Sequence, residues 1–242
     1  MTKRNPNRNS KDYYLGYRHP KLLIGHVVWQ YHRFLLSLRD VSELLLARGI
    51  ELSHETIREW ALKFGQPYAN EIKRRSPRRG DKWYLDEMCL VMKGKKHWLW
   101  RAVDQNGYEL DILLQSRKDK KAAKRFFKKL LKGLQYIPRV IITDKLPSYG
   151  AAKKEILPGV EHRQHKGLNN RAENSHQPTR QQEKQMRKFK SPKQAQRFLP
   201  VCGQIRNLFG LHRYKMAANN QRLHFFSAWN QWQGIITQTS CA

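Results

Sequence analysis

The chain has 242 residues, with 48 Lys and Arg against 19 Asp and Glu, which gives a net charge of +29 and a pI near 10.4. A charge of this size favours a polyanionic partner, and nucleic acid is the commonest one. No apolar run is long enough for a membrane-spanning helix, the N-terminus lacks a secretory signal, and the three cysteines form no CxxC pair, so we expect a cytoplasmic protein without a membrane partner.

The first 66 residues predict a DNA-binding domain made of helices. Residues 1–20 are polar and basic and indicate a loose arm. Over residues 21–66, apolar side chains recur at spacings of three and four, with Gly49 at a helix stop and Ser53 as an N-cap. Two short helices joined by a tight turn are typical of a helix-turn-helix, although an ordinary three-helix bundle fits the same pattern.

The predicted contacts with DNA lie on and after the third of these helices. We expect His54 and Arg58 to face double-stranded DNA from its polar side. Residues 67–80 contain two prolines and a run of three cations, and they predict a basic linker. Lys73, Arg74 and Arg75, which form that run, are expected to contact DNA phosphates.

Residues 81–190 change to a strand pattern and predict an α/β domain. Residues 83–90 alternate in polarity, and residues 96–116 predict two strands joined by a hairpin turn at Asn106-Gly107. An amphipathic helix over 119–134, a buried strand over 140–143 and a long polar helix from Asn169 follow. The order β-β-β-α-β-α-β-α indicates an antiparallel hairpin that feeds parallel strands. Residues 191–242 predict a C-terminal helical extension.

Three carboxylates stand out in the middle of this basic chain. Asp86 lies within the first predicted strand and Asp144 follows the fourth, so neighbouring strands would bring them to one edge of the sheet. Glu173, on the covering helix, is the candidate for a third acid, and Arg180 lies almost two helical turns further on the same face. Mg²⁺ prefers such oxygen ligands, but an Asp in the position of Asp144 is also a common turn former.

Two other groups of polar residues favour structural interpretations. Glu87 follows Asp86, and because a strand sends adjacent side chains to opposite faces, we expect Glu87 to be structural. His162 and His165 could form a metal pair. Since neither a cysteine nor a third histidine lies near them in sequence, packing or DNA contact is favoured over zinc binding.

The motifs in this region resemble those of a known family. The segments WYLDE, WLWRAVDQNGYELDILLQSRKDKKAAKRFF, IITDKLPSYGAA and EHRQHKGLNNRAENSH resemble the DDE transposases of bacterial insertion sequences, most of all the insertion-sequence-six family. The resemblance covers the chain from about Tyr17 to Phe209. It implies an α/β, ribonuclease-H-like catalytic core after an all-α helix-turn-helix domain. It also implies a metal-binding catalytic triad of Asp86, Asp144 and Glu173, with Arg180 as the downstream basic residue.

The resemblance also implies a function. A transposase of this kind binds the terminal inverted repeats of its element and catalyses metal-dependent DNA strand cleavage and strand transfer in the bacterial cytoplasm. The implied cofactor is Mg²⁺, as two ions for which Mn²⁺ can substitute. The implied partners are the element ends, the target DNA and a second copy of the chain, because two ends must be held together. The alternatives are a non-enzymatic helix-turn-helix regulator, an inactive transposase copy and a basic RNA-binding protein.

Overall fold

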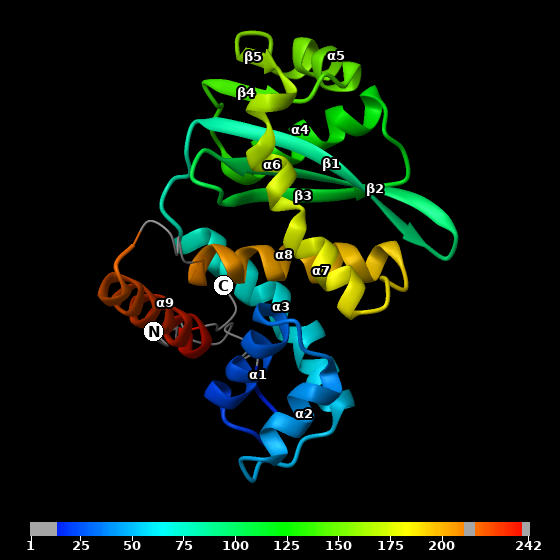
Figure 1. Ribbon diagram of the computed structural model, residues 1–242. Helices are drawn as coiled ribbons and strands as arrows, with labels where there is room; N and C mark the ends of the chain where they lie inside the picture. Colours follow the sequence, from blue (N-terminus) through cyan, green and yellow to red (C-terminus); the bar gives the residue numbers. More distant parts are fainter. Residues whose placement is uncertain (1–13, 211–215, 239–242) are drawn as a thin grey trace, which may run out of the picture. The chain divides into compact units, whose positions relative to one another are not determined.

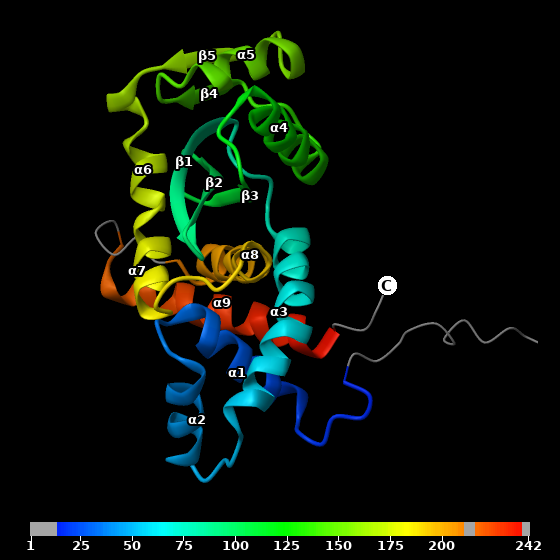
Figure 2. The same cartoon turned by 90° about the vertical axis from the view of Figure 1, so that its right-hand side faces the viewer.

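The computed structural model describes residues 14–210 and 216–238, and the chain divides into two compact units (Figure 1 and Figure 2). The first unit contains residues 1–75 and 204–242, and the second contains residues 76–203. Residues 1–13, most of the expected basic arm, lie outside the described residues. Within the described ranges, no helix is both long enough and apolar enough to cross a membrane.

The first unit is built from helices whose ends follow the sequence signals. They are α1 (Lys21–Arg33), α2 (Leu38–Leu46), α3 (His54–Arg75) and α9 (Ala218–Gln238). Ser37 and Asp40 form a reciprocal capping box at the start of α2. Gly49 takes a φ of +74° in the turn after α2, and the Ser53 hydroxyl accepts a hydrogen bond from the Thr56 N–H at the start of α3. The connection between α2 and α3 thus spans residues 47–53, and the turn at Gly49 is its first part.

Aromatic side chains hold the first unit together. Tyr14 stacks on Phe64 with 5.0 Å between ring centroids, and its hydroxyl lies 2.6 Å from that of Tyr68. Trp232 of α9 packs against Tyr68 at 5.1 Å and is fully buried. The expected arm thus gives way to packed structure by Tyr14, and the aromatic C-terminal segment belongs to the same core.

The helix α3 continues through the segment where the sequence predicted a linker over residues 67–80. It includes Pro67 and ends at Arg75, so only residues 76–81 lie outside regular structure before the next strand. A proline inside a helix costs about 3 kcal/mol because it removes one hydrogen bond and crowds the preceding turn. Tyr68, Ala69 and Ile72 are buried and continue the apolar face of the helix, and their burial offsets that cost.

The second unit is built on a mixed sheet with the strand order β3-β2-β1-β4-β5. Its strands are β1 (Lys82–Met92), β2 (Lys95–Asp104), β3 (Glu109–Gln115), β4 (Val140–Thr143) and β5 (Glu161–Gln164). The pairs β1–β2 and β2–β3 are antiparallel, whereas β4 and β5 run parallel to β1. Only β2 therefore runs against the others, which is the ribonuclease-H-like arrangement that the sequence predicted.

The predicted hairpin at Asn106-Gly107 is confirmed. Gly107 has a φ of +84°, which favours glycine, and the Asp104 carboxylate accepts hydrogen bonds from the N–H groups of Asn106 (2.8 Å) and Tyr108 (3.0 Å). The turn brings β3 back beside β2 and leaves β1 free to pair with β4 on its other side.

Helices cover both faces of the sheet (Figure 2). The helices α4 (Lys120–Leu134) and α5 (Pro147–Ile156) cover one face, and α6 (Asn170–Ser175) and α7 (Gln177–Gln185) lie on the other. A short 3₁₀ turn (Lys166–Leu168) precedes α6, and α8 (Pro192–Phe209) begins in the second unit and ends in the first. The main core lies under α4 and α5, where Trp83, Leu85, Trp100, Phe126 and Tyr149 are fully buried.

The proline inside α3 yields a stability prediction. We expect Pro67→Ala to raise the melting temperature of the protein, because alanine restores an N–H donor for the carbonyl of Lys63 and removes the ring clash. The gain should be about 1–3 kcal/mol, measured by thermal unfolding and by urea titration. Pro20→Ala is the matched control, since Pro20 lies before α1 and obstructs no hydrogen bond. A lower melting temperature for Pro67→Ala would contradict this view of α3.

Candidate active site

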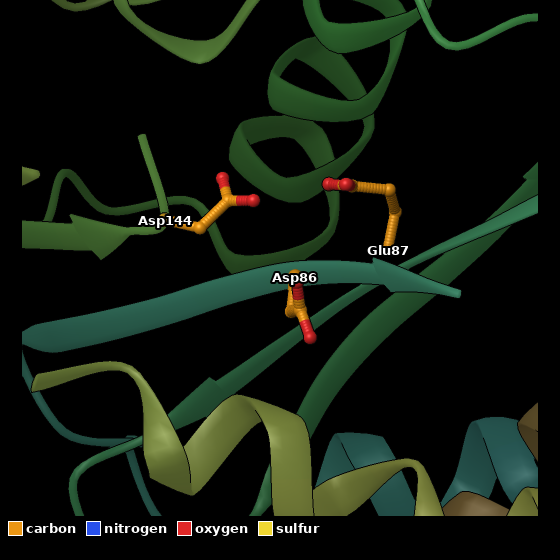
Figure 3. A group of neighbouring side chains, drawn as sticks. All are labelled: Asp86, Glu87 and Asp144. Atoms are coloured by element: carbon orange, nitrogen blue, oxygen red, sulfur yellow. The ribbon is translucent and has the colours of Figure 1, made fainter. Parts of the chain in front are cut away.

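Asp86 and Asp144 occupy the first positions beyond the parallel pairing of two strands. The pairing of β1 with β4 ends at Leu85 and Thr143, so each aspartate follows the last paired residue of its strand. One carboxylate oxygen of Asp86 and one of Asp144 lie within 4.8 Å of each other (Figure 3). The sheet thus brings together two of the three predicted acids.

The two interpretations of Asp144 are compatible. Its Oδ1 accepts a hydrogen bond of 3.0 Å from the N–H of Leu146, which shapes the turn before α5. A carboxylate has two oxygens with about four acceptor sites between them, so the turn leaves Asp144 able to bind a cation. The backbone hydrogen bond fixes the direction of the carboxylate toward the strand end.

Glu87 is the third acid of this cluster, although its position on β1 predicted a structural residue. Its side chain leaves β1 toward the face opposite Asp86, as strand geometry requires, yet one of its oxygens lies within 4.8 Å of an oxygen of both Asp86 and Asp144 (Figure 3). Because β4 has already ended at Thr143, no strand separates the two faces at this point. The signal for Glu87 was therefore the end of the neighbouring strand, rather than the alternation along β1.

Glu87 is buried and held by a cation. Its side chain is 2% exposed, and its Oε1 lies 2.5 Å from the Nζ of Lys118, while the buried Oε2 has no well-oriented hydrogen-bond partner. Burial raises the pKa of Glu87, with the Lys118 ammonium opposing that rise. A buried oxygen with acceptor capacity to spare, beside two more carboxylates, is a donor set of the kind that Mg²⁺ prefers. The residues therefore fit a divalent cation.

The helix α6 is attached to β1 at both of its ends. The Asn169 side chain, fully buried before the helix, donates a 2.9 Å hydrogen bond from Nδ2 to the carbonyl of Leu85. At the other end, Nε2 of His176 lies 3.3 Å from Oδ2 of Asp86, and burial lowers the pKa of His176. These two contacts place α6 against the strand position that carries Asp86. Neither residue is evident from the sequence, since buried polar groups give no periodic signal.

Arg101 fixes the junction between α6 and α7. It pairs with Asp86 across β1 and β2, is 1% exposed, and donates hydrogen bonds to the carbonyl of Ser175 and to the Thr179 hydroxyl (2.5 Å). Its Nε lies 3.2 Å from Oε2 of the buried Glu109 on β3. A buried arginine paired in this way is costly to disturb and holds its partners in one geometry.

Glu173 and Arg180 lie on the rim of a pocket that also includes Asp86 and Glu87. The pocket has a volume of about 600 Å³. Glu173 is exposed and lies outside the group formed by Asp86, Glu87 and Asp144. Arg180 is 54% exposed, and its Nη1 donates a 3.1 Å hydrogen bond to the carbonyl of Cys89. The pocket therefore brings the predicted arginine and glutamate to the same opening as Asp86.

The long helix predicted from Asn169 is two helices. α6 ends at Ser175 and α7 begins at Gln177, with His176 between them. Pro178 accounts for the break, because it lacks an N–H group and its ring crowds the carbonyl four residues earlier. The two helices still line one pocket, so the prediction of a continuous helix was wrong while Glu173 and Arg180 remain neighbours of the site.

Comparison with known proteins gives matches that agree on one family. Residues 80–212 match a family described as a DDE domain. The transposase for insertion sequence element IS257 of Staphylococcus aureus is 34% identical over 161 residues, which cover 64% of this chain and 71% of that protein. The transposase for the insertion sequence-like element IS431mec, from the same species, matches to the same extent. The chain belongs to the DDE transposases of insertion sequences.

Solved structures similar to this DDE transposase include retroviral integrase catalytic cores. The HTLV-2 integrase catalytic core domain in complex with magnesium is 15% identical, with a TM-score of 0.40 over 60% of this chain and 94% of that chain. The catalytic core domain of BIV integrase is 14% identical, with a TM-score of 0.36 over 63% of this chain and 99% of that chain. The family assignment rests on the sequence matches.

The transposase carries His54 and Arg58 at the start of α3. Arg58 is half exposed and lies 2.7 Å from a carboxylate oxygen of Glu55, one helical turn earlier. The Nε2 of His54 lies 3.5 Å from the other oxygen of Glu55. Both side chains are therefore accessible, and the Glu55 carboxylate between them holds them on one side of the helix.

The run Lys73-Arg74-Arg75 forms the last turn of α3 instead of a linker. Arg74 and Arg75 both pair with Glu71, at 2.6 Å and 2.5 Å, and they lower the pKa of Glu71 to about 2. Arg74 is 72% exposed and Lys73 is half-buried. The three cations therefore lie on a regular helix, where the macrodipole also favours positive charge.

The buried pair of Arg101 and Glu109 yields a prediction about stability. Arg101→Met should lower the free energy of unfolding by about 3–5 kcal/mol, because it leaves the Glu109 carboxylate buried without its guanidinium. The double variant Arg101→Met, Glu109→Leu should recover most of that loss, since no unpaired charge remains. Urea titration of the three proteins measures both effects. A double variant as unstable as the single one would contradict the ion pair as the main cause.

Proposed function

We propose that the protein is the active transposase of an insertion sequence. It binds the terminal inverted repeats of the element, cleaves DNA strands at their ends and joins them to target DNA. The observation that carries this proposal is the meeting of the Asp86 and Asp144 carboxylates at the end of β4, in a chain that belongs to the DDE transposases.

Divalent cations are the cofactor that we propose for this site. Asp86, Asp144 and Glu173 would hold two Mg²⁺ ions, for which Mn²⁺ can substitute, with Glu87 as an additional donor. When bound, such ions activate the attacking water or 3′-hydroxyl and stabilise the leaving oxygen of the phosphodiester. The N–H of Leu146 holds the Asp144 side chain, and the buried His176 ring lies beside the Asp86 carboxylate, so both carboxylates have fixed neighbours before DNA arrives.

Glu173 joins the site from the opposite side of the pocket in this proposal. Its helix is attached to β1 through Asn169 and His176, so the carboxylate is presented toward the opening that contains Asp86. Arg180, held against the Cys89 carbonyl at the same rim, binds a phosphate next to the scissile bond. Each of the two residues thus acts from a fixed backbone position.

Recognition of the element ends is assigned to the first unit. The start of α3 carries His54 and Arg58 toward base edges in the major groove, in the manner of a recognition helix. Lys73, Arg74 and Arg75 contact phosphates and add affinity without sequence preference. Because transposition brings two ends together, the working form is a dimer or a larger assembly of this chain on DNA, in the bacterial cytoplasm.

The catalytic assignment predicts a separation of cleavage from binding. Asp86→Asn, Asp144→Asn and Glu173→Gln should each lower metal-dependent nicking of terminal-repeat DNA by at least about 10³-fold, because a charged oxygen ligand is lost at almost constant shape. DNA binding, measured by fluorescence anisotropy, should stay within about threefold of wild type. Nicking is measured at saturating DNA with Mg²⁺ or Mn²⁺.

A control variant and the behaviour of the wild-type protein are needed to interpret the nicking rates. Asp119→Asn, at the N-cap of α4, is a matched carboxylate control and should nick DNA at the wild-type rate. A triad variant with near wild-type nicking would remove that residue from the assignment. Wild-type protein that binds the repeat but never nicks it would favour an inactive copy or a regulator.

The recognition assignment predicts different effects for two cations of α3. Arg58→Ala in the full chain should reduce the preference for terminal-repeat over random DNA by about 1–3 kcal/mol, because a base contact is lost. Lys73→Ala should weaken binding to both DNAs alike, since a phosphate contact carries no sequence information. Competition binding measures the two ratios. An equal loss of preference in both variants would exclude the start of α3 as the recognition element.

A further inference from the structure

The helix α7 ends in a turn that normally requires glycine. The N–H of Lys188 donates a 2.8 Å hydrogen bond to the carbonyl of Glu183, and the N–H of Arg187 donates one of 3.1 Å to that of Lys184. This pair of hydrogen bonds defines a Schellman motif, in which the residue after the cap is usually glycine. Here Arg187 and Lys188 occupy the turn with φ values of +49° and +70°. Two consecutive cationic residues therefore adopt a backbone conformation that side chains disfavour.

The burial of the next residue keeps the turn in place. Phe189 is 2% exposed and packs against Phe198 of α8 with 6.3 Å between ring centroids. Arg187 and Lys188 themselves are exposed, so their side chains add little packing to compensate for the strain. Attraction of a cation to the C-terminus of α7 does not require them either, because Lys184 already lies in the last helical turn. Fold stability alone gives no reason for cations at these two positions.

Their position relative to the pocket supplies a reason. Glu173, Gln177 and Arg180 line the pocket, Lys184 follows Arg180 on the same face of α7, and Arg187 lies two residues beyond the last residue of that helix. Lys184, Arg187 and Lys188 are exposed, and within the described part of the chain none of them pairs with a carboxylate. From Arg180 to the end of α7 at Gln185 the helix rises by about 8 Å, which is the length of about two base pairs, and Arg187 and Lys188 follow directly.

We propose that Lys184, Arg187 and Lys188 form a phosphate-binding track for the double-stranded DNA that flanks the scissile bond. The track begins at Arg180 on the pocket rim and follows the outer face of α7. The left-handed turn sets two cations side by side at the end of the helix, where a glycine turn would provide none. This inference rests on the proposed function of the pocket, because the track is needed only if a DNA strand enters it.

The proposal can be tested with glycine variants, because relief of backbone strain should raise stability while loss of a charge should weaken DNA binding. Arg187→Gly and Lys188→Gly should each raise the melting temperature, by about 2–4 °C, because glycine adopts a positive φ without strain. Each should also weaken binding to terminal-repeat DNA and lower the slope of log K against log salt by about 0.9, the value for one lost phosphate contact. Thermal unfolding and anisotropy titrations at several salt concentrations measure the two effects.

The end of α4 provides matched controls on the other face of the sheet (Figure 2). Gln135 is exposed with a φ of +58°, so Gln135→Gly relieves strain without a change of charge. Lys132 is an exposed cation in the last turn of α4, so Lys132→Gln removes a charge without relieving strain. We expect Gln135→Gly to raise the melting temperature and neither control to change the salt slope.

The outcomes separate the track from the proposed function. If Arg187→Gly and Lys188→Gly keep the wild-type salt slope, or if Lys132→Gln lowers it equally, the track is wrong. Wild-type nicking of the same DNA shows in that case that the proposed function stands. If wild-type protein neither binds nor nicks terminal-repeat DNA, the proposed function fails, whatever the variants do. A lower slope confined to the two α7 variants supports the track.

Discussion

Parallel hydrogen bonding between β1 and β4 ends at the pair Leu85–Thr143, and the position of this end determines the site. An aspartate follows this last pair in each chain segment, so the paired backbones place the two carboxylates at equivalent positions along the strand direction. Because β1 extends well past β4, Glu87 meets them from the other face. A shift of one residue in the pairing would point Asp86 into the core under α5. The buried alternation of Trp83 and Leu85 opposes such a shift.

The site also requires that α6 and α7 stay attached to β1 at the end of its pairing with β4, although the chain is very basic. The attachment uses buried polar groups: Asn169 on the Leu85 carbonyl, His176 on Asp86, and Arg101 on the end of α6. Such contacts contribute less net stability than apolar packing, but they specify one geometry, since the Leu85 and Ser175 carbonyls lose their buried donors if the helix moves. Positional precision at the pocket therefore comes from polar anchors, while the core under α4 and α5 supplies most of the stability.

Sequence patterns located the strands and the two aspartates because the signals were local. A buried run before Asp144 and alternation around Asp86 follow directly from strand geometry. The position of Glu87 beside the two aspartates was not predicted, since alternation says nothing about where a neighbouring strand stops. The proline at 67 suggested a linker because its cost is local, whereas the burial of Tyr68 and Ile72 that offsets it depends on tertiary packing.

The parts of the site that the sequence did not reveal depend on tertiary contacts. Arg101 and His176 look like ordinary polar residues, and only their burial beside Asp86 indicates what they do. The strained turn at Arg187 and Lys188 was equally invisible, since neither residue type favours a positive φ. The shared pocket of Asp86 and Glu173 likewise required the fold, because α6 reaches β1 from 84 residues further along the chain, as the Asn169–Leu85 hydrogen bond shows.

Iron-directed cleavage of the protein backbone tests the central claim most directly, because it reports which segments surround a bound divalent cation. Fe²⁺ takes the place of Mg²⁺, and ascorbate with peroxide then cuts the chain next to the metal. The account predicts cuts near residues 85–88, 143–145 and 172–174 of the full-length protein, all suppressed by excess Mg²⁺. Cuts at the two strand ends without one in α6 would contradict the role of Glu173. Cuts at none of the three segments would contradict the metal site itself.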